Sequence, residues 1–171
     1  MTPDIESTDL GPHKNRAIIL AKSLIKDAGV LTAPVSLRQI MEHLQKSRDV
    51  TLLRVTDFSE KISGLLVVCA EVDKDYAVIG YNDKHPWCRR RFTIGHEIGH
   101  LLMGQACNQR PEDQSHDETE ANLFSSELLM PAEFIKKDFK KSPDIPALAR
   151  QYLVSAEAMS YRLMRAKLLR K

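Results

Sequence analysis

Two histidines and a glutamate in the middle of the chain have the types and spacing of a metal-dependent hydrolase. They lie in the run His96-Glu97-Ile98-Gly99-His100. If this run is helical, His96 and His100 project from one side, one turn apart, and can bind the same ion. Glu97 then lies beside the pair, where its carboxylate can reach a water without ligating the metal. The pattern predicts metal-assisted hydrolysis of an amide with Glu97 as the base.

The types of these side chains favour Zn²⁺. Catalytic zinc is held by three protein ligands, often neutral imidazoles and a carboxylate, and keeps a fourth position open for water. Manganese or another divalent ion is an alternative, because imidazole and carboxylate bind these metals too. Histidines on an amphipathic helix can also simply pack or cap. The full His-Glu-x-x-His pattern, on a helical segment that ends at Gly104, favours the metal site instead.

A second helical segment, residues 117–130, contains the candidate third ligand. On a helical wheel Glu120 shares a face with the apolar Leu123 and Phe124, whereas Glu118 points almost the opposite way. A carboxylate on the apolar face needs a positive partner, because burying an unpaired charge is costly. A zinc ion would provide that charge. The sequence therefore predicts Glu120 as the third ligand and Glu118 as a solvated acid near the helix N-terminus.

These two stretches resemble the ImmA/IrrE family of metallo-endopeptidases. The matching runs are residues 90–102, which contain His-Glu-x-x-His, and residues 120–131, which read Glu-Ala-Asn-Leu-Phe-Ser-Ser-Glu-Leu-Leu-Met-Pro. The second run discriminates better, because His-Glu-x-x-His alone occurs in many zinc peptidases. Ser125 departs from the family pattern, in which alanine is frequent at this position. The change is small and affects no residue with an expected chemical role.

The resemblance implies a small gluzincin-like domain in which His96, His100 and Glu120 hold one catalytic ion and Glu97 is the base. Family members are typically cytoplasmic proteins that cleave a helix-turn-helix repressor and so relieve repression. The expected partner is therefore a repressor of this kind. A regulatory binding protein that acts through protein or DNA contact, without proteolysis, is the alternative. The intact set of ligands and base favours the peptidase.

The sequence on either side of these residues predicts an α+β fold. The expected architecture is a zincin-like single domain with helical N-terminal and C-terminal parts. Three short segments rich in β-branched and aliphatic residues predict a small three-stranded antiparallel sheet packed on the metal-binding helix; they are residues 50–55, 62–69 and 76–81. Residues 76–82 are expected at the sheet edge, where a strand can bind an extended substrate. The alternative is that the strands only support the helix.

The chain is predicted to comprise a flexible N-terminus (1–10), a metallopeptidase domain (11–140) and a C-terminal helical pair (141–171) packed on that domain. The pair resembles a helix-turn-helix and carries several basic residues. It can therefore recognise the substrate, close the cleft or bind DNA.

Two further residues are candidates for contacting the substrate or a developing oxyanion. Residues 105–116 are polar and are expected to form a loop over the cleft. His116 belongs to this loop, and Tyr81 lies at the end of the third expected strand. Either side chain would donate a hydrogen bond to the oxyanion.

The composition is that of a soluble globular protein and indicates no partner by itself. The 25 basic and 23 acidic residues give a net charge of +2, which is too balanced to indicate nucleic acid or an anionic membrane. No apolar run approaches the roughly 18 residues of a membrane span, and the first residues are acidic rather than a secretion signal. The sequence therefore predicts a cytoplasmic protein without membrane contact.

Overall fold

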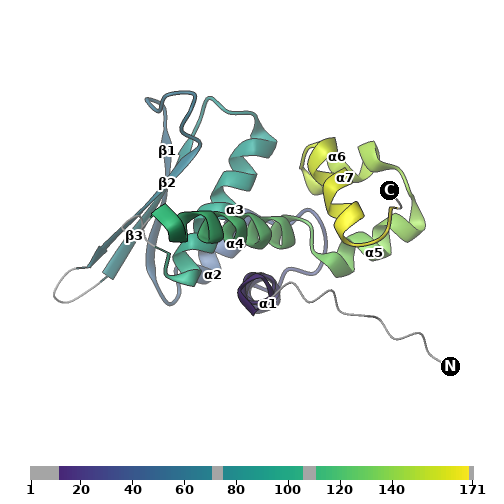
Figure 1. The fold of residues 1–171 in the computed structure, drawn as a ribbon, viewed down its shortest axis with the longest axis horizontal. Helices are drawn as coiled ribbons and strands as arrows, with labels where there is room; N and C mark the ends of the chain where they lie inside the picture. Colours follow the sequence, from purple (N-terminus) through teal and green to yellow (C-terminus); the bar gives the residue numbers. More distant parts are fainter. Residues whose placement is uncertain (1–11, 71–74, 106–110, 170–171) are drawn as a thin grey trace.

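The computed structural model describes residues 12–70, 75–105 and 111–169, which form helices and a small sheet (Figure 1). The elements follow the chain as α1 (Pro12–Asp27), α2 (Leu37–Leu44), β1 (Asp49–Val55), β2 (Gly64–Ala70), β3 (Asp75–Asn82), α3 (Trp87–Met103), α4 (Pro111–Leu129), α5 (Ala132–Lys141), α6 (Ile145–Tyr152) and α7 (Ala156–Arg165). The predicted α+β class is confirmed. The expected flexible N-terminus lies outside the described residues.

The sheet has three strands, as predicted, but it is mixed rather than antiparallel. Its order is β1-β3-β2, with β3 parallel to β1 and antiparallel to β2. The prediction that residues 76–82 form the edge is therefore wrong, because β3 is the central strand. The cause is the connection 56–63, which passes the end of β3 and places β2 on its far side.

Asn82, at the end of β3, holds this crossing connection. Its amide nitrogen donates hydrogen bonds to the carbonyls of Ser59 (3.0 Å) and Ile62 (2.8 Å), and its backbone N–H donates to Ser63 (2.9 Å). The Asn82 side chain is fully buried, so these bonds satisfy an amide that water does not reach. They also fix where β2 begins, at Gly64.

One face of the sheet packs against α3. Buried side chains on this face come from all three strands: Val50, Leu66, Ala77 and Ile79. From α3, Ile94 and Ile98 enter the same core. The sheet therefore supports the back of the helix that carries the histidines, as the sequence predicted.

Helix α4 packs against both α3 and α1, and it approaches α3 very closely. A Cβ atom on Gly95 would lie 2.7 Å from Ser125 Oγ, and one on Gly99 would lie 3.1 Å from Phe124. Ser125 also donates a hydrogen bond to the carbonyl of Phe92 (2.8 Å). The two glycines thus allow the helices to lie close enough for side chains of α4 to reach the histidines.

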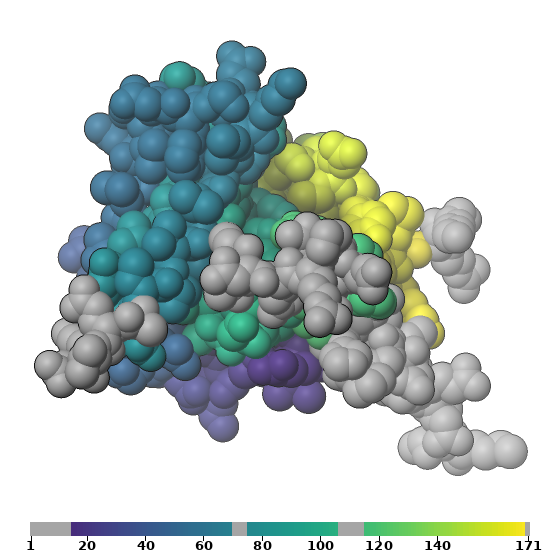
Figure 2. All heavy atoms as spheres, turned by 60° about the vertical axis from the view of Figure 1, so that its left-hand side comes forward, coloured from purple at the N-terminus to yellow at the C-terminus, as the bar shows by residue number. Residues whose placement is uncertain are grey.

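The C-terminal helices are attached through a buried ion pair. Arg162 on α7 contacts Glu127 on α4 and donates a hydrogen bond to the carbonyl of Met130 (2.9 Å). Glu127 in turn accepts the backbone N–H of Ala132 (3.1 Å), at the start of α5. Figure 2 shows α6 and α7 (yellow) on one side of the molecule and the strands (blue) on the other.

No helix among the described residues is long and apolar enough to cross a membrane.

Candidate metal centre

Helix α3 carries the two histidines one turn apart, and their rings converge. The two Nε2 atoms are 2.9 Å apart, and the ring centroids are 4.6 Å apart with the ring planes almost perpendicular. Both side chains are largely shielded from solvent, with 14% of His96 and 12% of His100 exposed. The helix ends at Gly104, which has the left-handed conformation (φ 70°) expected of a C-terminal cap.

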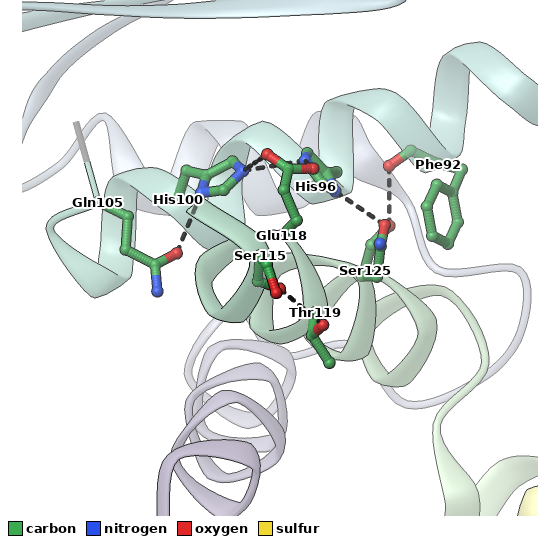
Figure 3. Close-up of polar contacts among 9 residues, drawn as sticks. Phe92, His96, His100, Gln105, Ser115, Glu118, Thr119 and Ser125 are labelled. Carbon is green, nitrogen blue, oxygen red and sulfur yellow. Dashed lines mark hydrogen bonds and ion pairs between the residues drawn. The ribbon is translucent and has the colours of Figure 1, made fainter. Parts of the chain in front are cut away.

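Glu118, on α4, supplies a carboxylate to the same point. Its two oxygens lie 3.3 Å from Nε2 of His96 and 3.3 Å from Nε2 of His100 (Figure 3). One ligand atom from each of the three residues lies within 4.8 Å of the others. Within the described part of the chain, no other group of three His, Cys, Asp or Glu residues is arranged to hold a metal ion.

The structure thus differs from the expectation for the third ligand. Glu120 is 5% exposed and lies beside Gln105, whose amide nitrogen donates to Glu120 Oε2 (2.5 Å). The face of α4 toward α3 runs instead through Glu118, Asn122 and Ser125, which contact His96, His100 and Phe92. The apolar residues of α4 did not identify the face that points to α3, because α4 packs against both α1 and α3 and is buried on both sides.

The Nδ1 atoms of both imidazoles, on the side of the ring away from Glu118, face side-chain amides. Nδ1 of His96 lies 3.0 Å from Asn122 Oδ1, and Nδ1 of His100 lies 3.0 Å from Gln105 Oε1. An amide oxygen only accepts, so a neutral imidazole in this position carries its proton on Nδ1 and presents a lone pair at Nε2. The Nε2 lone pairs of His96 and His100 and the carboxylate of Glu118 then point to one place. None of these three groups carries a hydrogen that it could donate to the others. Such a donor set fits a divalent cation, and zinc is among the ions that prefer it.

Glu97, the residue after His96 on α3, is buried, with 8% of the residue exposed. A Cβ atom on Gly64, the first residue of β2, would lie 2.8 Å from Glu97 Oε1, so the backbone of the strand approaches the carboxyl closely. Burial, and secondarily the negative charge of Glu118, raise the pKa of Glu97 to about 7. A carboxyl with this pKa can both accept and return a proton near neutral pH.

Burial also acts on the first histidine. It lowers the pKa of His96, and the positive charge of a protonated His100 would lower it further. The lowered pKa favours the neutral imidazole, which is the form that ligates a metal, although the charge of Glu118 and the hydrogen bond to Asn122 act in the opposite direction.

The two candidate substrate contacts do not join this cluster. Tyr81 lines a separate pocket of about 640 Å³ between α2 and the first half of α3, together with Leu37, Met41 and Trp87. His116 is exposed on α4, because that helix begins at Pro111 within the stretch expected to be a loop. It precedes Glu118 by two positions and so points nearly the opposite way.

Hollows of similar size lie on both sides of the histidines. At the His100 end, a pocket of about 550 Å³ is lined by Gln105, by the end of α3, and by the inner residues Leu66 and Val68 of β2. At the other end, a pocket of about 590 Å³ is lined by Asn122, Phe92 and residues of α7. One hollow thus adjoins His100, and the other adjoins Asn122, whose amide oxygen faces His96.

Sequence reasoning missed three residues of this site: Gln105, Glu118 and Asn122. One signal for two of them was present, because Glu118 and Asn122 are four residues apart and share one helical face, as His96 and His100 do. For Gln105 the only indication was its place directly after the Gly104 cap.

Comparison with known proteins gives a family and a fold. The model of the Peptidase_M78 family, described as the IrrE N-terminal-like domain, matches residues 47–164. Comparison with curated proteins gives no match. Among solved structures, a Mycobacterium tuberculosis transcriptional regulator is similar, with a TM-score of 0.63 at 16% identity over 87% of this chain. The match covers 46% of that protein, so the present chain spans about half its length.

The solved structure supports the fold alone, because the identity is low. The family match shows membership of the family, because it covers well over half of the chain. It includes all of the sheet and both helices of the site. This region includes the His-Glu-x-x-His run, Glu118 and Asn122. The chain therefore belongs to the ImmA/IrrE peptidase family.

Proposed function

We propose that the protein is a zinc-dependent endopeptidase that hydrolyses a peptide bond in a specific cytoplasmic protein. His96, His100 and Glu118 would hold the ion, and Glu97 would be the general base. The observation that carries this proposal is the convergence of two imidazole nitrogens and a carboxylate at one point beside a buried carboxyl group. Glu118 replaces Glu120 as the proposed ligand because of its 3.3 Å distances to both rings.

The proposed reaction divides the work between the ion and the chain. When bound, a divalent ion supplies Lewis acidity that polarises the scissile carbonyl and makes water nucleophilic at neutral pH. Glu97 takes the proton of the attacking water and returns it to the leaving amine. In the metal-free protein its pKa is about 7. Asn122 and Gln105 keep the imidazoles oriented through their Nδ1 atoms.

The proposed substrate is a helix-turn-helix transcriptional repressor, whose cleavage would relieve repression. Three observations support this choice: the resemblance to ImmA/IrrE proteins, the similarity to a protein described as a transcriptional regulator, and the hollows on both sides of the histidines. A zincin-like arrangement is part of the same proposal. Direct DNA binding by α6 and α7 is a less favoured role for their basic residues.

The alternative is a regulatory protein that binds its partner without cutting it. The similar solved structure is that of a transcriptional regulator, which is compatible with this role. Binding alone leaves unexplained why a carboxyl with a raised pKa lies beside two converging imidazoles.

The deciding experiment is mass spectrometry of the helix-turn-helix repressor encoded nearest the gene, after incubation with zinc-loaded protein. Glu97→Gln is the matched control, because glutamine keeps the size of the side chain but cannot take the proton. We expect defined fragments with the unaltered protein and none with Glu97→Gln, although both bind zinc. An uncut repressor held in a stable complex by both proteins would favour the regulatory alternative.

A further inference from the structure

The His100 ring is held by a chain of two side chains, Gln105 and Glu120, whereas His96 is held by Asn122. Gln105 directly follows the Gly104 cap, and its backbone N–H donates to the carbonyl of His100 (2.9 Å). The left-handed turn at Gly104 thus folds the chain back along the last turn of α3. As a result the Gln105 side chain lies beside the His100 ring, with Oε1 3.0 Å from Nδ1.

An amide can present either its oxygen or its nitrogen to a neighbour, and Glu120 decides which one faces His100. Glu120 Oε2 accepts a hydrogen bond from Gln105 Nε2 at 2.5 Å. A carboxylate only accepts, so the amide nitrogen must face Glu120 and the amide oxygen must face His100. Bonds to an ionised carboxylate are also stronger than neutral ones, so the reversed amide is disfavoured.

We propose that Glu120 is a positioning residue that acts through Gln105 to fix the tautomer of His100, protonated at Nδ1 and with the Nε2 lone pair free for the ion. This inference rests on the proposed metallopeptidase function. It gives a role to the buried acid that sequence reasoning selected as a ligand. Glu120 is 5% exposed, whereas the Glu118 side chain, which touches both imidazoles, is 59% exposed. The two acids therefore do different work: Glu118 faces the ion, and Glu120 orients a ligand.

The tautomer can be read without metal or substrate. Long-range proton–nitrogen NMR spectra at about pH 8.5, above the ordinary histidine pKa of about 6.5, report which ring nitrogen carries the hydrogen. We expect Nδ1–H for His100 in the unaltered protein. Gln105→Leu should add a population with Nε2–H, and Glu120→Gln should do so to a smaller extent because a reversed amide becomes accessible. An unchanged His100 tautomer in both variants would overturn the proposal.

Zinc affinity, measured by competition with a chelator, separates a positioning role from direct ligation. Loss of a group that orients a ligand typically lowers metal affinity about 10- to 100-fold, and we expect a loss in this range for Gln105→Leu. Glu120→Gln should lower affinity in the unaltered chain but have no further effect when Gln105 is already leucine. An equal loss in both backgrounds would mean that Glu120 acts on the ion directly, and this would overturn the proposal.

A matched control and a folding check complete the test. Gln39→Leu removes another half-buried glutamine, whose amide donates to the carbonyl of Ala28 (2.7 Å) away from the site, and should leave zinc affinity unchanged. Circular dichroism verifies that each variant is folded, and Glu120→Gln keeps the side-chain volume. Absence of peptide hydrolysis would contradict the proposed function. The tautomer and the zinc affinity would still decide the role of Glu120.

Discussion

Glu97 is a carboxyl group whose chemistry is set by packing more than by charge. Its pKa rises from 4.5 to about 7 mainly because the side chain is buried, and only secondarily because of Glu118. The energetic consequence is separate from catalysis. A carboxyl that is easier to ionise in the unfolded chain than in the folded protein weakens folding as the pH rises.

This predicts a pH-dependent effect of Glu97→Gln on the metal-free protein. Below pH 4.5 Glu97 is protonated in both states; between 4.5 and about 7 only the unfolded state ionises, so stability is progressively lost, and the loss is complete above 7. Glutamine avoids this loss. We expect Glu97→Gln to be more stable than the unaltered protein by about 1–3 kcal/mol at pH 8 and about equal to it at pH 4.5. Urea unfolding at both pH values measures the difference.

A constant difference at the two pH values would contradict this account of Glu97. Comparing the variant with the unaltered protein at each pH cancels the titration of all other groups. Zinc must be removed with a chelator before the measurement.

At the same scale, the sequence selected His96, Glu97 and His100 through their spacing. The structure brings the Nε2 atoms of the two histidines to 2.9 Å from each other and buries Glu97 on the same helix. The sequence did not identify Glu118. Burial was used to choose between the two acids, and Glu120 is indeed the buried one. An open metal site, however, lies where solvent reaches, so a residue facing the ion can be exposed. The rotation of α4 about its axis depends on contacts with α1 and α3, which no local pattern encodes.

At the scale of elements, the start of β2 approaches α3 closely at Gly64. A Cβ atom on Gly64 would lie 2.4 Å from Thr93 Cγ2 and 2.8 Å from Glu97 Oε1. We expect Gly64→Ala to lower stability by about 1–3 kcal/mol through overpacking and to reduce peptide hydrolysis by displacing Glu97. Thermal unfolding and fragment yield measure the two effects.

Gly80→Ala is the matched control in the neighbouring strand. There a Cβ atom would meet Val55 at 3.4 Å and Phe58 at 3.6 Å, which are ordinary contacts. This variant should therefore keep both stability and hydrolysis. Equal effects of the two substitutions would show that the contact with Glu97 has no special role.

The contact between α3 and α4 predicts that a second substitution restores the stability lost through the first. A Cβ atom on Gly95 would be 2.7 Å from Ser125 Oγ but 3.4 Å from Ser125 Cβ. Gly95→Ala should therefore destabilise the protein by about 1–3 kcal/mol. In a Ser125→Ala background the clash is removed, and the better helix propensity of alanine, about 0.5–1 kcal/mol, should make the same change neutral or stabilising. A double-mutant cycle in urea measures the coupling, and additive effects would contradict it.

The elements themselves were largely predictable, but their order in the sheet was not. β-branched runs located three strands, and the two site helices were expected, although α4 begins at Pro111 rather than at residue 117. The expected antiparallel sheet was not observed, because β3 pairs in parallel with β1. Whether β1 joins β2 or β3 depends instead on where residues 56–63 cross, and the buried bonds of Asn82 settle this. The sequence alone does not indicate that a single asparagine at the end of a strand determines which strands pair.

At the scale of the whole molecule, a buried ion pair joins α7 to α4, and Met159 and Leu163 of α7 enter the apolar core. Glu127 is 2% exposed and Arg162 is 5% exposed, and each makes further hydrogen bonds to backbone at the junction of α4 and α5. Arg162→Met would leave Glu127 charged, buried and without this partner. We expect a loss of about 3–5 kcal/mol, measured by chemical denaturation.

The double variant Arg162→Met with Glu127→Leu tests the cause. It removes both charges and should recover much of the stability, because the isolated charge is the main cost. Exposed Arg38 and Glu42, which pair one turn apart on α2 (2.8 Å), are the comparison. Arg38→Met should change stability by less than about 1 kcal/mol. Equal losses at the two sites would contradict the role of burial.

The contacts that build the site join residues at different separations along the chain. Both imidazoles, Gln105 and Glu118 belong to the consecutive helices α3 and α4 or the turn between them, whereas Glu97 is packed against the backbone of Gly64, in a strand formed well before them in the sequence. Contacts between nearby segments require less loop-closure entropy and form sooner. We therefore expect a refolding chain to bind zinc before Glu97 is packed against Gly64, which stopped-flow experiments with a zinc-sensitive dye would detect. Zinc binding would then precede the placement of the proposed general base, so that hydrolytic activity would appear later in refolding than metal binding.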